Sequence, residues 1–304
     1  MKRFVLSWFV LLLLPVATQA RQSGLSFLRV GPDAEFLATG DAGAAVVAGP
    51  FAAERNPAGL AFGSGTEVAL THHVWIAGVR TYGGAARFNL GRGGLGVYAR
   101  AVSSGAIDVR SGPGPSEGSF EAQFTGAGVA VAQAFGPLRV GAGVKLLSER
   151  IFAVSATGTA FDVGAQIDLA GGAVRLAGTY QNAGSMKKLA QRSTRLPRAA
   201  RGAVAVYPFR VISVDDGTRL VEAFLTAEVA RDLADESTQL HFGASVDVME
   251  TVRVRAGYVT NDDLRGVSGG IGLLAGPFKV DYAVLPFSAG FEGPGHVFSL
   301  TYGL

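Results

Sequence analysis

The sequence contains no cysteine among its 304 residues. That absence excludes a disulfide framework and thiol-based catalysis, and it removes thiolate ligands from any metal site. Charged residues make up only 17% of the chain, and the formal net charge at pH 7 is +3. A charge so near neutral does not indicate a nucleic-acid partner.

Long apolar runs are also absent beyond the N-terminus, where no stretch reaches the ~18 uncharged residues that a membrane-spanning helix needs. Yet the mean hydropathy of +0.30 is high for a soluble domain, and 43 residues are glycine. An apolar, glycine-rich chain without spanning helices can still cross a membrane as a closed β-barrel. These properties predict an all-β, transmembrane antiparallel barrel. The alternative is a soluble β-sandwich with a solvated outer face.

Residues 1–20 have the features of a secretory signal peptide. Lys2 and Arg3 supply a basic start, residues 4–14 an apolar core, and residues 18–20 small side chains at the cleavage positions. Because the apolar run is about half of the ~20 residues that a membrane span needs, we expect a cleaved signal and not an anchor helix.

The segment 21–65 differs from the chain that follows it. It is rich in small residues, shows no sustained alternation, and contains prolines that would interrupt a strand ladder. Asn56-Pro57 favours a turn, and Gly59 allows backbone shapes that other residues resist. Its apolar character predicts a compact, irregular segment that packs inside another structure.

Residues 66–304 show regular strand patterns and are expected to form the barrel. They predict fourteen strands, an even number as in single-chain bacterial outer-membrane barrels. The expected ranges are 66–74, 77–90, 93–104, 119–135, 137–151, 158–170, 173–182, 198–208, 219–231, 236–248, 251–260, 265–275, 277–286 and 295–304.

The last of these strands predicts how the barrel closes. Phe298, Leu300, Tyr302 and Leu304 alternate with small or polar residues, so they share one face of a strand. In a sandwich this strand would be an exposed edge, whereas in a barrel it pairs with the first strand.

Alternation also predicts which side chains face the lumen. Phe278 and Val280 share one face of their strand while Lys279 and Asp281 share the other. If the apolar faces meet lipid, the lumen holds Arg100, Arg139, Lys145, Asp162, Asp168, Arg175, Glu222, Glu228, Asp247, Arg253, Arg255, Lys279 and Asp281. Both signs are interleaved, so we expect these charges to pair across the lumen.

Connection lengths favour the barrel as well. Short turns are expected at 91–92, 136, 171–172, 249–250 and 276, and longer connections at 105–118, 152–157, 183–197, 232–235, 261–264 and 287–294. This alternation is typical of outer-membrane barrels, which have short periplasmic turns and longer outer loops. The connections at 75–76 and 209–218 depart from it.

The two ends of the mature chain resemble the PorV/PorQ outer-membrane proteins, through Phe27–Gly31, Gly40–Ala44, Asn56–Leu60, Asp281–Phe287 and His296–Tyr302. That family is similar in architecture to the FadL long-chain fatty-acid transporters, with fourteen strands and an N-terminal plug in the lumen. The resemblance implies that Asn56, Pro57, Ala58 and Gly59 belong to such a plug. The chain departs from the family pattern at Asp41, where a small or apolar residue is common, and at Leu304, where an aromatic is usual.

The resemblance implies a non-enzymatic protein of the bacterial outer membrane, in contact with its lipid, with two alternative roles. PorV-type members take part in type IX secretion, which implies secretion-system proteins or exported cargo as partners. FadL-type relatives are passive uptake channels for hydrophobic small molecules. The long loops 105–118 and 183–197 do not decide between these roles.

Other motifs carry less information. Lys187, Lys188, Arg192, Arg195, Arg198 and Arg201 form a run without an acid, which fits either lipopolysaccharide phosphates or an anionic partner, or simply a solvated loop. The Gly91-x-Gly93-x-x-Gly96 run lies between strands and opens no helix, so it does not predict a nucleotide cofactor. The four histidines have no metal-ligand spacing, and no Gly-x-Ser-x-Gly elbow nominates a nucleophile. A hydrolase with a non-local triad stays open as an alternative.

Overall fold

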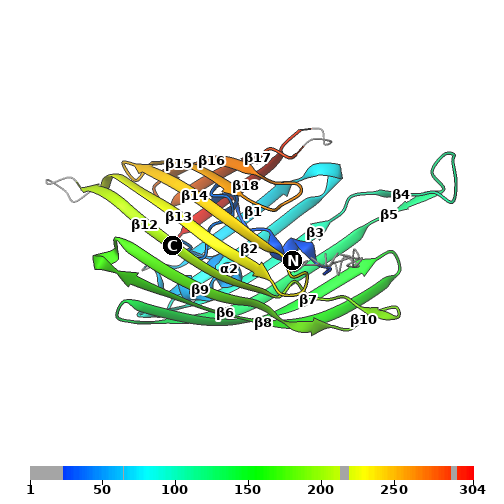
Figure 1. Cartoon of the computed structure of the whole chain (residues 1–304), viewed down its shortest axis with the longest axis horizontal. Coiled ribbons are helices and arrows are strands. Elements are labelled where there is room, and N and C mark those ends of the chain that lie inside the picture. The colour runs from blue at the N-terminus through cyan, green and yellow to red at the C-terminus, as the bar shows by residue number, and fades with distance from the viewer. Residues whose placement is uncertain (1–22, 64, 213–218, 289–292) are drawn as a thin grey trace, which may run out of the picture.

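The computed structural model describes residues 23–63, 65–212, 219–288 and 293–304. The expected signal peptide at 1–20 lies outside the described residues. Fourteen antiparallel strands form one closed barrel (Figure 1), so the predicted fold class is confirmed. Its strands are β1 (Glu67–Val74), β2 (Arg80–Asn89), β3 (Gly93–Ser103), β6 (Ala122–Phe135), β7 (Leu138–Ile151), β8 (Val154–Leu169), β9 (Val174–Met186), β12 (Ala199–Ile212), β13 (Arg219–Asp232), β14 (Thr238–Val248), β15 (Val252–Val259), β16 (Val267–Ala275), β17 (Phe278–Leu285) and β18 (Gly295–Gly303).

The barrel closes between its first and last strands. β1 pairs with β18 from Glu67 opposite Gly303 to Val74 opposite His296. On the outer face of β18, Phe298 is 49% exposed and Leu300 is 42% exposed; Tyr302 has the same parity, and Leu304 follows the strand. Closure leaves no sheet edge with unsatisfied backbone groups.

The outer surface of the barrel is apolar. On β17, Phe278 and Val280 are exposed, whereas Asp281 is buried on the inner side. The same alternation runs round the barrel, so large aliphatic and aromatic side chains cover its outside. A wall of this kind suits the hydrocarbon of a membrane. Among the described residues, no helix is long and apolar enough to span a membrane.

The strand connections define two ends of the barrel. The short-turn end carries the connections 90–92, 136–137, 170–173, 249–251 and 276–277, including the one-turn helix η4 (Ala170–Gly172). The loop end carries 75–79, 104–121, 152–153, 187–198, 233–237, 260–266, 286–288 and 293–294, including η3 (Ile76–Gly78), the hairpin β4 (Ile107–Val109)–β5 (Gly118–Phe120) and the hairpin β10 (Lys188–Leu189)–β11 (Arg192–Ser193).

Two predicted connections were wrong, and a third lies mostly outside the described residues. The expected loop 152–157 is a turn of Phe152 and Ala153 alone, because β7 and β8 stay paired up to Ile151 opposite Val154. The expected loop 183–197 begins later, because β9 continues to Met186 past an irregularity in its pairing with β8. β12 extends to Ile212, so most of the expected connection 209–218 falls on residues 213–218, which are outside the described ones.

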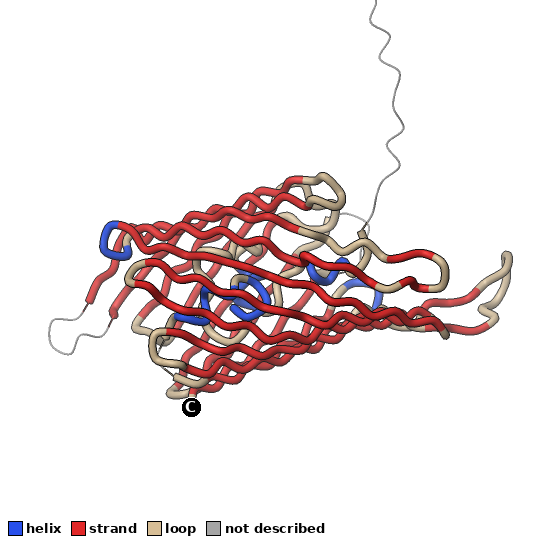
Figure 2. The backbone as a smooth tube through the Cα atoms, turned by 90° about the horizontal axis from the view of Figure 1, so that it is seen from below, coloured by secondary structure: helices blue, strands red, loops and turns tan. Residues whose placement is uncertain are grey.

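Residues 23–63, which we call the inner segment, lie inside the barrel. Figure 2 shows their short helices surrounded by strands, and most of their side chains are buried. The helices are η1 (Ser26–Arg29), α1 (Ala34–Ala38), α2 (Ala52–Arg55) and η2 (Pro57–Ala61). The barrel wall therefore has lipid-facing side chains on one face and, on the other, side chains that contact the inner segment.

Candidate functional site

The inner segment keeps its shape through local caps. The Asp33 carboxylate accepts a hydrogen bond from the Phe36 N–H at 3.0 Å and caps α1. Asn56 does the same for the Ala58 N–H at 3.2 Å, and Pro57 occupies the first turn of η2. Between these helices the backbone at Gly40 has a φ of +65°, in the left-handed region that glycine tolerates. These features stabilise the beginnings of α1 and η2 and the turn that follows α1.

On one side of the barrel, the inner segment packs against glycines of the wall, which have no side chain. A Cβ at Gly94 would lie 2.2 Å from the Leu60 oxygen, and one at Gly141 would lie 2.5 Å from the Pro57 carbonyl carbon. A Cβ at Gly164 would lie 2.0 Å from the Asn56 side-chain oxygen. Inward glycines on β3, β7 and β8 therefore form a surface onto which η2 fits closely, and any larger residue would displace it.

The opposite wall makes the same kind of contact with the end of α1. A Cβ at Gly257 would lie 1.9 Å from the Gly40 nitrogen, and one at Gly243 would lie 2.6 Å from the Thr39 oxygen. The Gly40 oxygen contacts His241 Nδ1 at 2.8 Å, and the Gly40 N–H donates to the Ser268 hydroxyl at 3.1 Å. The inner segment thus bridges the lumen from β14–β16 to β3, β7 and β8.

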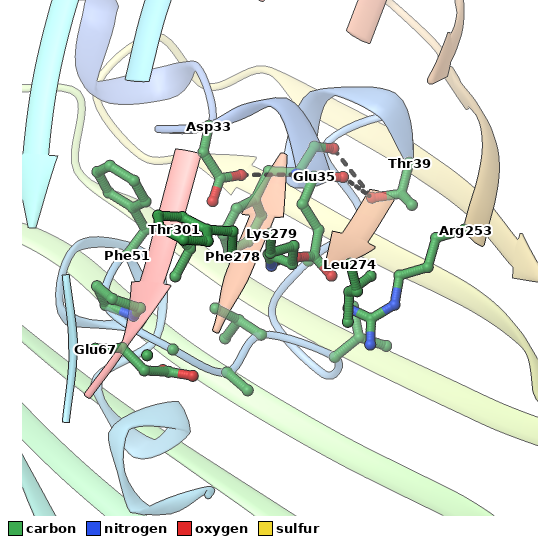
Figure 3. Close-up of a pocket in the computed structure, with 18 of the residues that line it drawn as sticks. Asp33, Glu35, Thr39, Phe51, Glu67, Arg253, Leu274, Phe278, Lys279 and Thr301 are labelled. Carbon is green, nitrogen blue, oxygen red and sulfur yellow. Dashed lines mark hydrogen bonds and ion pairs between the residues drawn. The ribbon is translucent and has the colours of Figure 1, made fainter. Parts of the chain in front are cut away.

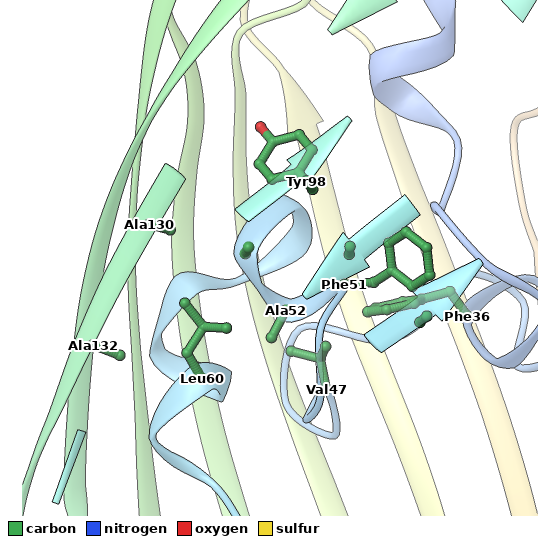
Figure 4. Packing of buried hydrophobic residues seen from close by; sticks show 11 residues of the cluster. Phe36, Val47, Phe51, Ala52, Leu60, Tyr98, Ala130 and Ala132 are labelled. Carbon is green, nitrogen blue, oxygen red and sulfur yellow. The ribbon is translucent and has the colours of Figure 1, made fainter. Parts of the chain in front are cut away.

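Apolar side chains complete the contact near η2. Figure 4 shows Leu60, Ala52, Val47 and Phe51 packed against the wall below Tyr98. These residues belong to one buried cluster with Phe36, Ala53, Ala69, Ala85, Ala130 and Ala132. The small alanines of the wall leave room for the larger side chains of the segment.

Buried ions join the segment to the wall in the middle of the lumen. Arg55 contacts Asp41 at 2.9 Å and Glu228 at 3.5 Å, and Arg201 contacts Glu228 at 2.7 Å. The second Glu228 oxygen accepts the Ala44 N–H at 2.8 Å. Burial raises the pKa of Asp41, but the cations, Arg55 first, outweigh it and hold that pKa below its usual value. Asp41, the departure from the family pattern, is therefore a charged partner of Arg55.

Two further carboxylates of the segment bind wall cations. Glu54 contacts Arg100 at 2.5 Å, and Glu35 contacts Lys279 at 2.6 Å and Arg255 at 3.3 Å. Burial raises the pKa of Glu35, but Lys279 and then Arg255 overcome that effect and lower it. The segment thus supplies counter-charges that stop these wall cations from being isolated in the lumen.

The structure places the expected lumen charges on the inner face and divides them into two groups. Arg100, Glu228, Arg255 and Lys279 contact charged residues of the inner segment directly, and Arg175 donates a hydrogen bond to the Ala45 oxygen at 3.4 Å. Ion pairs within the wall join Arg139 and Arg175 to Asp168 (2.8 and 2.5 Å), Lys145 to Asp162 (2.8 Å), Arg253 to Asp247 (2.8 Å), and Arg255 to Asp281 (2.7 Å). Glu222 lines a cavity described below. The expectation of pairing across the lumen was therefore incomplete, because the segment occupies the middle.

Sequence reasoning missed Glu35, Glu54 and Arg55 as functional residues. All three lie in a segment that is rich in small and apolar residues. Charged side chains in so apolar a stretch were the available signal, since such a segment can be enclosed only if its ions find partners. The four motif residues Asn56–Gly59 are fully buried, with Asn56 donating to the Ala44 oxygen at 2.8 Å.

A cavity of about 370 Å³ lies between the segment and strands β13–β18 at the short-turn end. Figure 3 shows Phe51, Leu274, Phe278 and Thr301 around it, with Glu35 reaching towards Lys279. A second cavity of about 350 Å³, lined by Glu222, Asp247, Glu250, Thr251, Arg253, Leu274 and Gly276, adjoins it. The first cavity therefore combines apolar side chains with ionic groups, as sites for small molecules commonly do, whereas the second is lined mainly by ionic groups.

Asp33, which lines the cavity of about 370 Å³, has a side-chain carboxyl group with an unusually high pKa. Burial, together with the neighbouring carboxylate of Glu35, raises the pKa of Asp33 to about 7. Its charge thus changes near neutral pH. No group of three or more His, Asp and Glu side chains in the described part of the chain could hold a metal ion.

Comparison with known proteins shows the fold. The toluene transporter TbuX of Ralstonia pickettii is similar over 90% of this chain and 98% of its own, with a TM-score of 0.61 and 14% identity. A deltaS2 mutant of TodX, a monoaromatic hydrocarbon channel, is similar over the same shares, with a TM-score of 0.52 and 12% identity. No family model and no curated protein sequence matches the chain. The class defined by the fold is a closed fourteen-stranded β-barrel with an apolar outer surface and the architecture of these hydrocarbon channels.

Proposed function

We propose that this chain is a passive outer-membrane conduit for small apolar molecules, with the inner segment as its plug. The observation that carries the proposal is the cavity of about 370 Å³ between the segment and β13–β18, whose lining includes the apolar side chains of Phe51, Leu274 and Phe278. The similarity in fold to a toluene transporter and a monoaromatic hydrocarbon channel supports it. A molecule of about the size of toluene fits a cavity of this volume.

The arrangement of apolar and ionic groups indicates what must move. At the loop end, Leu25, Phe27 and Leu28 of the segment pack with Leu147 and Met186 of the wall. At the short-turn end lies the cavity, and between the two run the ion pairs of Glu35, Glu54 and Arg55. An apolar molecule passing from one apolar region to the other has to cross this ionic layer. Passage therefore requires the part of the segment around α1 to move away from β17.

The test is uptake of radiolabelled toluene by Gram-negative cells that lack other hydrocarbon channels and express this chain. Thr301 lines the cavity, so Thr301→Trp fills it, whereas Thr125 is exposed on the outer face of β6 and Thr125→Trp is the matched control. We expect uptake to fall to background in Thr301→Trp and to stay at the parent rate in Thr125→Trp. Equal uptake in both variants, with both barrels folded, overturns the proposal.

A second candidate function, a PorV/PorQ-type component of type IX secretion, is favoured by a different observation. The motif Asn56–Gly59 that carries the family resemblance is buried and closely enclosed against Gly141 and Gly164. In this role the filled lumen is permanent, and the loop end binds secretion partners or exported cargo. Affinity purification from the native membrane separates the two roles. Stoichiometric secretion proteins support this one, whereas a lone barrel that retains apolar compounds supports the conduit.

A further inference from the structure

The band of apolar residues on the outer face of β7 ends abruptly towards the loop end of the barrel. Its outward residues are Leu138, Val140, Ala142, Val144 and Leu146. These eight residue steps span about 26 Å along the strand, or about 20 Å of membrane height at a typical strand tilt of ~40°. The next outward residues towards the loop end are Ser148 and then Arg150.

The neighbouring strands change character at the same height. On β8 the outward Phe161, which is 57% exposed, is followed by Thr159 and Thr157. The backbone oxygen of Thr157 accepts a hydrogen bond from the backbone N–H of Lys187 at 2.7 Å. In the pairing of β7 with β8, Thr157 lies opposite Ser148. Lys187 therefore lies beside Thr157 at the polar rim of the apolar band, and Arg150 lies two residues beyond Ser148 on β7.

The positive charge continues along the connection from β9 to β12. Six exposed cations, which we call the basic arc, lie in this region: Arg150, Lys187, Lys188, Arg192, Arg195 and Arg198. From β7 to β12 the acidic residues are Glu149, Asp162 and Asp168, and all three lie on the inner face, paired with wall or loop groups. Within the described residues none of the six cations forms an ion pair. Figure 1 shows the ends of β7, β8 and β10 lying together.

We propose that the basic arc binds the phosphate groups of membrane lipids in the leaflet at the loop end. The height of the cations places them beside headgroups when the apolar band lies in hydrocarbon. Exposed Leu146 and Phe161 directly below them offer a surface for the acyl chains of the same lipid. A soluble polyanion would use the charges but would leave that apolar contact unused. Each Lys or Arg near an anionic membrane surface contributes roughly five-fold to binding.

The experiment measures lipid binding by native mass spectrometry of the full barrel in neutral detergent. The probes are a phosphorylated lipid A, phosphatidylglycerol and phosphatidylcholine, each titrated separately. The test variant is Arg150→Gln/Lys187→Gln. The control removes two exposed cations elsewhere, Arg92→Gln in a turn at the short-turn end and Arg110→Gln, which pairs with Asp108 between β4 and β5. Heat-modified mobility on gels verifies that both variants fold.

We expect both phosphate-bearing lipids with net negative charge to bind more tightly than phosphatidylcholine. Their affinity falls about thirty-fold in the test variant and less than two-fold in the control. Stronger binding of lipid A than of phosphatidylglycerol assigns the arc to a phosphorylated glycolipid, and equal binding assigns it to anionic lipid phosphates in general. Equal affinity for phosphatidylcholine, an unaffected test variant, or complete displacement of lipid A by millimolar inorganic phosphate overturns the proposal and leaves only a solvated surface.

Discussion

Replacing Gly257 by alanine is expected to detach α1 from the barrel wall without opening the barrel. The added Cβ would lie 1.9 Å from the Gly40 nitrogen and 2.2 Å from the Thr39 carbonyl carbon. Both are backbone atoms, so no side-chain rotation can relieve the clash. Because ordinary contacts begin near 3.5 Å, the segment has to move by roughly 1.6 Å.

A movement of that size has a calculable consequence. It breaks the contacts of Gly40 with His241 and Ser268, which are 2.8 and 3.1 Å long. Losing two such hydrogen bonds costs about 1–3 kcal/mol, and overpacking adds about 1–3 kcal/mol. The docked state, in which the inner segment contacts the barrel wall, is then less stable by at least ~2 kcal/mol. This corresponds to an increase of about thirty-fold in the fraction of molecules whose segment has left the wall.

Because the chain has no cysteine, a single introduced thiol reports on docking. Ala42→Cys in the buried part of the segment reacts with a membrane-impermeant maleimide only when the segment leaves the wall. We expect the labelling rate to rise about thirty-fold with Gly257→Ala. Gly202 on the outer side of β12 has no atom within 4 Å of an added Cβ, so Gly202→Ala should leave the rate unchanged. Equal rates in both backgrounds would refute the described contact.

Two further substitutions test the ions of the segment. Arg55→Met leaves Asp41 buried without its closest cation, so it should destabilise docking of the segment by about 3–5 kcal/mol. As a control, Arg110→Gln removes an exposed ion pair with Asp108 and should cost less than ~1 kcal/mol. Thiol labelling measures both effects. The Asp33 pKa of about 7 exceeds that of an unfolded aspartate, so the docked state binds the extra proton and loses stability as pH rises from about 4 to 7. Asp33→Asn should remove this loss, seen as a smaller drop in melting temperature between pH 5 and pH 8 than in the parent chain, and an identical drop would contradict the assignment.

The sequence predicted the barrel well because its periodicity acts locally. The alternation of Phe278 and Val280 with Lys279 requires only that one side of a strand be apolar. Repeated along the chain, this pattern predicted both the number of strands and which side chains face outward. Turn positions were less predictable: at Phe152 and Ala153 the strands stay paired further than their composition indicates.

The site could be predicted only in part. Inward charges follow from strand parity, but their partners lie in a segment whose path depends on contacts far away in the chain. Arg55 and Glu228 are 173 residues apart, and nothing in the local pattern of either identifies the other. In the sequence, Gly141 and Gly257 cannot be distinguished from other strand glycines. Their role becomes clear only from the segment backbone that contacts them in the structure.

The most direct test of the account is whether the segment must leave β17 for an apolar molecule to pass. Glu35 and Lys279 face each other beside the cavity, so Glu35→Cys/Lys279→Cys can be joined by a reducible bifunctional methanethiosulfonate. The account predicts that joining the two thiols stops toluene uptake and that reduction restores it, while the singly substituted Glu35→Cys, treated in the same way, keeps its uptake. Undiminished uptake through the joined barrel would contradict it.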